Sequence, residues 1–156
     1  MLLKGKKIVL GVTGGIAVYK AVDLVSRLRK QGAEVRVVMT EHARQFVTPL
    51  TFKEISGNAV ATSMWNSNQE FNVEHIALAN WADVFVVAPA TANIIAKMAH
   101  GLADDLLSTT LLAAQAPIIV CPAMNTGMYE NALTQENITC LKKHGVTVMA
   151  PATGFL

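Results

Sequence analysis

The feature that most constrains the fold is a series of short apolar runs that alternate with amphipathic segments. Residues 84–87 are apolar at every position, whereas a strand with one wet face would alternate. Continuously apolar strands separated by helices predict a parallel sheet that is buried on both faces. We therefore expect a doubly wound α/β domain, Rossmann-like or flavodoxin-like, with helices on both faces and right-handed crossovers. The predicted strands cover residues 6–13, 34–40, 83–90, 117–124 and 146–151.

The segments between these strands read as helices. The clearest one follows the first strand, ends at Gly32, and carries an apolar stripe formed by Ala17, Ala21, Leu24, Val25 and Leu28. Thr40 can cap a short helix over residues 41–46. Residues 58–72 read as an irregular segment. Because no repeat or linker interrupts the pattern, we expect one domain over residues 1–156, with further helices over 48–57, 73–82, 91–101, 104–115 and 134–145.

Composition excludes several classes of function. The net charge is only +2 and no basic cluster exceeds residues 4–7, so we expect no binding to nucleic acid. No stretch approaches the roughly 18 apolar residues of a membrane helix. Cys121 and Cys140 show neither pairing nor metal spacing, which predicts two reduced thiols in a cytosolic protein without a metal. Only 15% of the residues are charged, which favours an oligomer that hides part of its surface.

In a doubly wound sheet, ligands bind at the carboxyl ends of the strands, so the strand exits are the candidate site segments. "GVTGGIAVYK" places Gly14 and Gly15 where the first strand turns into a helix, and backbone N–H groups there can approach an anion. The spacing is not the dinucleotide G-x-G-x-x-G, and Lys20 lies too far inside the helix for a Walker lysine. This segment is predicted to contact a phosphate or the edge of a flavin. The alternative is that it is a turn that only connects two elements.

Other polar residues allow two interpretations each. Thr91 and Asn93 follow the third strand, where they can cap a helix or contact a ligand. The hydroxyls of residues 108–110 can face a site or bond back to their own helix, and the second is commoner. His75 stands among apolar neighbours, where a histidine is more often a satisfied core residue than a functional one. The other histidines are expected at the surface.

Four ordered motifs together resemble one family, the homo-oligomeric flavin-containing cysteine decarboxylases. The motifs are "GVTGGIAVYK", "EHIALANWAD" with His75, "APATANIIAKMAHGLADDLLSTTLLA", and "PAMNTGMY", and the likeness covers essentially the whole chain. The resemblance implies FMN as the cofactor and a homo-trimer or dodecamer with FMN between subunits. The cofactor-binding residues that it implies are Gly14, Gly15, Ile16, Ala17, Thr40, Ala90, Thr91, Asn93, Ser108, Thr109 and Met124, with Ser108 and Thr109 near the phosphate.

The resemblance also implies a reaction, decarboxylation of 4'-phosphopantothenoylcysteine towards 4'-phosphopantetheine in coenzyme A biosynthesis. The flavin would oxidise the thiol to a thioaldehyde, and loss of CO2 would leave an enethiol. His75 matches the family's active-site histidine and would handle a proton. Asn125 matches the amide that holds the substrate carboxylate, in a pocket walled by Met124 and Met128.

Departures from the family pattern, and alternatives to it, lead to further expectations. Tyr129 stands where the family has Trp, and Ile94 where it has Thr. The family continues beyond the position of Leu156 into a flap whose cysteine helps to reduce the enethiol. We therefore expect a truncated domain, to which a phosphopantothenoylcysteine synthetase domain can be fused in the full-length protein, and which does not complete turnover efficiently. The alternatives are a peptidyl-cysteine decarboxylase and a non-catalytic flavin-binding regulatory protein, although retention of His75 and Asn125 argues against the latter.

Overall fold

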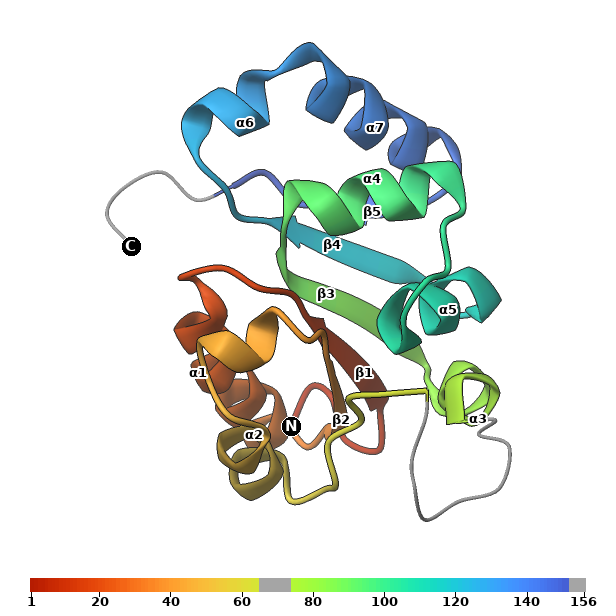
Figure 1. The fold of residues 1–156 in the computed structure, drawn as a ribbon. Helices are drawn as coiled ribbons and strands as arrows, with labels where there is room; N and C mark the ends of the chain where they lie inside the picture. Colours follow the sequence, from red (N-terminus) through yellow and green to blue (C-terminus); the bar gives the residue numbers. More distant parts are fainter. Residues whose placement is uncertain (65–73, 152–156) are drawn as a thin grey trace.

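Five strands form one parallel sheet in the order β2-β1-β3-β4-β5 (Figure 1). The computed structural model describes residues 1–64 and 74–151. This strand order is the flavodoxin-like one, and the direction of winding reverses between β1 and β3. The predicted doubly wound parallel sheet is therefore confirmed. The strands are β1 (Lys7–Val12), β2 (Glu34–Met39), β3 (Val84–Ala90), β4 (Ile118–Pro122) and β5 (Thr147–Val148).

Helices cover both faces of the sheet, as predicted. One face packs against α1 (Val18–Lys30) and α2 (Pro49–Ser56). The other face carries α3 (Glu74–Trp81), α4 (Ala92–His100), α5 (Leu106–Ala113) and α7 (Ala132–Lys143). In the part of the chain that the structure describes, no helix is long and apolar enough to cross a membrane.

Side chains of the central strands alternate between two separate cores. Val9 and Phe85 belong to the core under α3, α4, α5 and α7, whereas Leu10 and Val12 belong to the core under α1 and α2. Because both faces are covered, β1 is buried at every position after Lys7. This explains why the strands read as continuous apolar runs in the sequence.

Three elements differ from the prediction. The helix expected over residues 41–46 is a single 3-10 turn, Ala43–Gln45, and β5 has only two residues instead of six. A five-residue helix, α6 (Thr126–Glu130), was not predicted and follows β4 directly. Within the predicted irregular segment, Ala61 forms an isolated bridge with Val38, and residues 65–73 lie outside the described residues.

Candidate functional site

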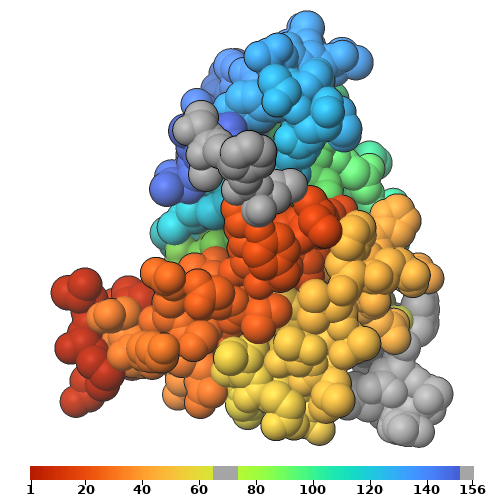
Figure 2. Space-filling view, turned by 90° about the vertical axis from the view of Figure 1, so that its left-hand side faces the viewer, coloured from red at the N-terminus to blue at the C-terminus, as the bar shows by residue number. Residues whose placement is uncertain are grey.

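A cleft of about 660 Å³ opens at the carboxyl ends of the first three strands. Figure 2 shows this end of the molecule, where the segment after β1 lies between the segment after β2 and the region of α6. The cleft therefore occupies the point where the winding of the sheet reverses, as expected for a ligand site in this fold. Its lining includes Thr13, Gly14, Met39, Thr40, Glu41, His42, Thr62, Ser63, Met64, Thr91, Asn93, Lys97, Asp104, Asp105 and Met128.

The loop between β1 and α1 presents backbone to this cleft. A Cβ atom added to Gly14 would lie 2.5 Å from Cβ of His42, so the packing of the loop requires glycine there. At Gly15 an added Cβ would meet nothing within 4 Å, so the fold itself does not demand glycine. Among the described residues, no acceptor pairs with the N–H groups of residues 14–17. Ile16 is exposed and Ala17 is buried beneath the loop.

Polar side chains of the neighbouring strand exits line the same cleft. Oγ1 of Thr40 accepts a hydrogen bond from the Ala43 N–H at 3.2 Å, as its predicted capping role requires. Oγ1 of Thr91 caps α4 by accepting from the Ile94 N–H at 3.2 Å. Thr91 and Asn93 both line the cleft, so capping and ligand contact are compatible there. Ala90 is fully buried at the end of β3 and is not in the cleft lining.

Asn125 caps the short helix α6, and this cap orients its amide group. Oδ1 accepts from the N–H groups of Gly127, at 2.9 Å, and Met128, at 3.3 Å. Because only the oxygen can accept, the cap assigns the two ends of the amide. Nδ2 has no acceptor among the described residues, so two N–H donors remain on an exposed side chain. Of the two methionines expected beside it, Met128 lines the cleft and Met124 packs against the core.

His75 lies on α3, on the face that also carries the buried Leu78 and Ala79. Its Nδ1 atom is buried and has no hydrogen-bond partner among the described residues. The alternative of a satisfied core histidine is therefore not what the structure describes, since a buried polar atom without a partner is costly. His75 does not line the cleft, and α3 and α6 lie at opposite ends of the sheet (Figure 1).

The hydroxyl groups of α5 are engaged within that helix. Ser108 and Asp105 form a capping box, in which the Ser108 N–H donates to Oδ1 of Asp105 at 2.8 Å. The Thr109 hydroxyl donates to the Asp105 carbonyl at 2.6 Å, and the Thr110 hydroxyl donates to the Leu106 carbonyl at 2.7 Å. These bonds match the back-bonding interpretation. Neither Ser108 nor Thr109 lines the cleft.

Sequence reasoning missed the charged wall of the cleft. The Lys97 ammonium, whose side chain is only 17% exposed, lies 2.8 Å from Oδ1 of Asp104 and 3.9 Å from Oδ2 of Asp105. The hydrogen bond from Lys97 lowers the pKa of the Asp104 carboxyl. Lys97 could have been predicted from the sequence, because it follows Asn93 by four residues and therefore lies on the same side of α4.

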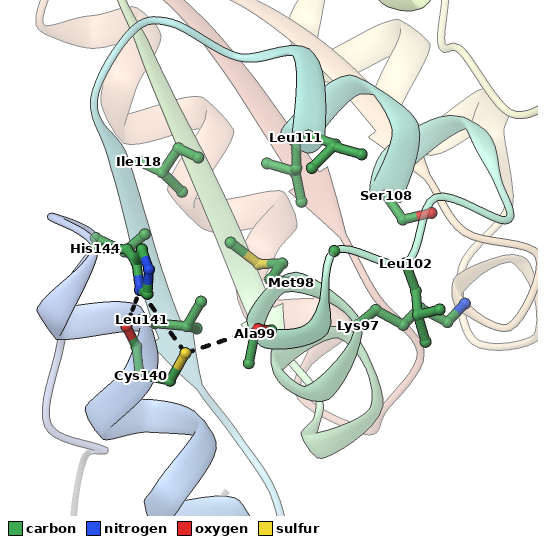
Figure 3. A pocket seen from close by; sticks show the side chains of 13 residues that line it. Lys97, Met98, Ala99, Leu102, Ser108, Leu111, Ile118, Cys140, Leu141 and His144 are labelled. Atoms are coloured by element: carbon green, nitrogen blue, oxygen red, sulfur yellow. Dashed lines mark hydrogen bonds between the residues drawn. The ribbon is translucent and has the colours of Figure 1, made fainter.

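A second pocket, of about 410 Å³, lies between α4, α5 and α7 (Figure 3). Nδ1 of His144 lies 2.8 Å from the Cys140 carbonyl oxygen and 3.8 Å from Sγ of Cys140. Since a carbonyl only accepts, Nδ1 carries the proton and cannot take one from the thiol. Cys121 lies elsewhere, on β4, and burial raises the pKa of its thiol. Among the described residues no group of three potential ligands could hold a metal ion.

The cleft suits a planar cofactor that carries a phosphate. Its volume lies within the range of small-molecule sites, about 300–1,000 Å³. The open position at Gly15 and the N–H groups of residues 14–17, which have no acceptor among the described residues, offer a close backbone approach to an anion at the start of a helix. Thr40, Thr91 and Asn93 add polar groups that can contact a ring system. The residues present therefore fit a flavin mononucleotide.

Sequence comparison places this fold and cleft within a known class of proteins. The chain belongs to the flavoprotein family, whose model matches residues 2–156. It is 52% identical over 152 residues to the coenzyme A biosynthesis bifunctional protein CoaBC of Vibrio vulnificus, covering 97% of this chain. The match spans only 38% of the length of that relative.

Solved structures of similar fold include decarboxylases. The FMN-dependent cysteine decarboxylase SpaF superposes with a TM-score of 0.91 at 36% identity, covering 97% of this chain and 87% of that one. A PPC decarboxylase variant in complex with pantothenoylaminoethenethiol superposes with a TM-score of 0.81 at 32% identity, covering 97% and 85%. Both similarities extend over the sheet and the helices that build the cleft.

Proposed function

We propose that the chain holds FMN in the strand-end cleft and removes CO2 from an acylated cysteine, phosphopantothenoylcysteine. The observation that carries this proposal is the Asn125 amide, whose Oδ1 accepts from α6 and whose Nδ2 has no acceptor among the described residues. Asn125 is not itself in the cleft lining, but Met128, whose N–H it binds, is. The names of the relatives support the choice of cofactor and substrate. Residues 14–17 would hold the cofactor phosphate, and Thr40, Thr91 and Asn93 would contact the rest of the flavin.

When bound, FMN supplies a two-electron acceptor for the substrate thiol, which gives the adjacent carbon an electron sink for loss of CO2. Asn125 then has a simple task. Its two Nδ2–H groups donate to the substrate carboxylate and hold it near the cleft, while the cap prevents the amide from turning its oxygen towards that anion. The amide leaves the carboxylate free to depart as neutral CO2 because it donates hydrogen bonds without forming a covalent bond.

His75 is the proposed proton-handling group. Its Nδ1 atom, which is buried and has no partner within residues 1–64 and 74–151, can donate or accept one hydrogen bond. Because α3 and α6 lie at opposite ends of one sheet, we propose that His75 acts in a cleft completed by a second copy of the chain. A homo-trimer, free or stacked into a dodecamer, would bring the two together. The exposed Ile16 and Phe46 near the cleft supply apolar surface for such a contact.

The first experiment is a visible absorption spectrum of the purified chain, with the released chromophore identified by mass. A yellow protein that releases FMN supports the proposal, whereas a colourless protein that takes up no added FMN contradicts it. CO2 release is then compared between phosphopantothenoylcysteine and a peptide ending in cysteine. Faster release from the peptide would favour a peptidyl-cysteine decarboxylase, the activity class that the similarity to the peptidyl-cysteine decarboxylase EpiD leaves as the second candidate.

A further inference from the structure

Thr13 directly follows β1, and its hydroxyl joins two strand ends. The residue is 2% exposed, and Oγ1 donates to the Pro89 carbonyl at 2.6 Å. The same oxygen accepts from the Thr91 N–H at 3.0 Å. A hydroxyl has one donor and two acceptor positions, so Thr13 uses both of its functions at once. No feature of the sequence marks this residue, because both partners lie more than 70 positions away.

The link is needed because β3 is irregular at this point. The register between β3 and β4 shifts between Val87 and Ala90, and the ladder between β1 and β3 ends at Gly11 and Val87. Bulges of this kind redirect a strand and leave backbone groups without ladder partners. The Pro89 carbonyl accepts from both the N–H of Thr13, at 3.3 Å, and its hydroxyl. Thr13 thus continues the connection between β1 and β3 past the end of the ladder.

The redirected segment is the one that faces the cleft. Thr91 receives its N–H contact from Thr13 and caps α4 with its own hydroxyl, while Thr91 and Asn93 line the cleft. We propose that Thr13 is a positioning residue for the cofactor, because its hydroxyl holds Thr91 and Asn93 where they can contact a bound flavin. This inference rests on the proposed function, in which the cleft holds FMN.

Three variants test the link. Thr13→Val keeps the shape of the side chain and removes both hydrogen bonds, whereas Thr13→Ser keeps the hydroxyl. The matched control is Thr110→Val, because Thr110 is fully buried and its hydroxyl also donates a short bond, yet it lies on α5 away from the cleft lining. We expect Thr13→Val to weaken FMN binding at least about tenfold, or about 1.4 kcal/mol. Thr13→Ser and Thr110→Val should stay close to the wild-type dissociation constant.

Two measurements distinguish a role of Thr13 in positioning Thr91 from a general effect on the stability of the protein. FMN is titrated into the flavin-free proteins by fluorescence, and hydrogen exchange of the Thr91 amide is followed by NMR. In Thr13→Val the Thr91 amide should exchange faster than in Thr13→Ser, because it has lost its acceptor. Equal FMN affinity and equal Thr91 exchange in these two variants would overturn the proposal.

FMN binding by the wild-type protein separates a failure of the proposed function from a failure of the proposed role of Thr13. If the wild type takes up no FMN, the proposed function fails before Thr13 is tested. If Thr13→Val does not fold, Thr13→Cys replaces it, since a thiol is a weaker donor and acceptor than a hydroxyl. The FMN affinity of Thr13→Cys should then be lower than that of Thr13→Ser. Equal affinities would contradict the proposed positioning role.

Discussion

Replacement of Asn125 by Asp separates the structural task of this residue from its chemical one. An aspartate caps a helix as well as an asparagine does, so Oδ1 can still accept from the Gly127 and Met128 N–H groups. The two Nδ2–H donors, however, are replaced by an oxygen that carries negative charge. We therefore expect Asn125→Asp to fold and to bind FMN like the wild type, but to repel the substrate carboxylate.

The size of the effect follows from two contributions. A hydrogen bond to a charged group is worth about 1.5–3 kcal/mol. Two carboxylates about 4 Å apart repel by about 4 kcal/mol at an effective dielectric constant of about 20. With only one lost hydrogen bond counted, together they raise the barrier by about 5.5–7 kcal/mol, which corresponds to a fall in kcat/KM of about 10⁴-fold or more. The assay is CO2 release from phosphopantothenoylcysteine, with FMN content and Tm measured on the same samples.

The chain provides a matched control for this substitution. Asn131 caps α7 in the same way, with Oδ1 accepting from the Leu133 N–H at 2.9 Å. Neither asparagine is in the cleft lining, but Asn125 accepts from the N–H of Met128, which lines the cleft, whereas Leu133 does not line it. Asn131→Asp should leave kcat/KM, FMN content and Tm unchanged. An Asn125→Asp protein that retains more than about a tenth of the wild-type rate would refute the reasoning. A loss of FMN or of stability in that variant would contradict the premise that aspartate preserves the cap, and the fall in rate could then not be assigned to the lost donors.

Three further predictions concern stability and reactivity. Asp105→Ala removes the cap of α5 and should lower the free energy of unfolding by about 1–2 kcal/mol, seen in calorimetry as a fall in Tm of roughly 2–8 °C, whereas Asp105→Asn should retain most of it. Phe52→Ala empties a fully buried position and should cost about 3–5 kcal/mol in urea unfolding; a cost below about 1 kcal/mol would mean that the core collapses around the gap. Burial raises the pKa of the Cys121 thiol, so this group favours the folded state below its unfolded pKa and loses that contribution as pH rises through its folded pKa. Peptide mapping should accordingly show slower iodoacetamide alkylation of Cys121 at pH 8 in the native protein than in urea, and equal rates would contradict the burial argument.

The strands were predictable because they are short, continuously apolar runs between helical segments, and the long helix α1 was predictable because its apolar residues recur at helical spacing. The helix α6 was not, because five residues containing Gly127 carry no usable period, and its start depends on the Asn125 cap. The shortness of β5 was also hidden, since an apolar run does not reveal how much of it finds a partner strand. Of the candidate site, the strand exits were foreseen. The separation of His75 from Asn125 was not foreseen, although the order of elements implies it, because α3 leads into the start of β3 whereas α6 follows the end of β4.

The hydrogen bonds of the Thr13 hydroxyl could not be predicted from the sequence. One partner, the Pro89 carbonyl, lies where the register between β3 and β4 shifts, and the other, the Thr91 N–H, directly follows β3. Such a shift is a property of paired strands rather than of any one segment. Lys97 was missed for a similar reason, because its acidic partners come from the connection between α4 and α5. Local patterns therefore located the cleft, while the contacts that shape it depend on residues that are distant in the sequence.

The two cores on either side of the sheet are built from different parts of the sequence. Every buried residue of the core under α1 and α2 lies between Ile8 and Phe52, except Ala88. The opposite core takes only Val9 and Val38 from that first part and draws the rest from residues 61–141. Since a chain leaves the ribosome from its N-terminus, the first core can be nearly complete while the second is still being synthesised. During that interval the other face of β1 and β2 stays uncovered, and it is the surface that a nascent-chain chaperone would need to shield.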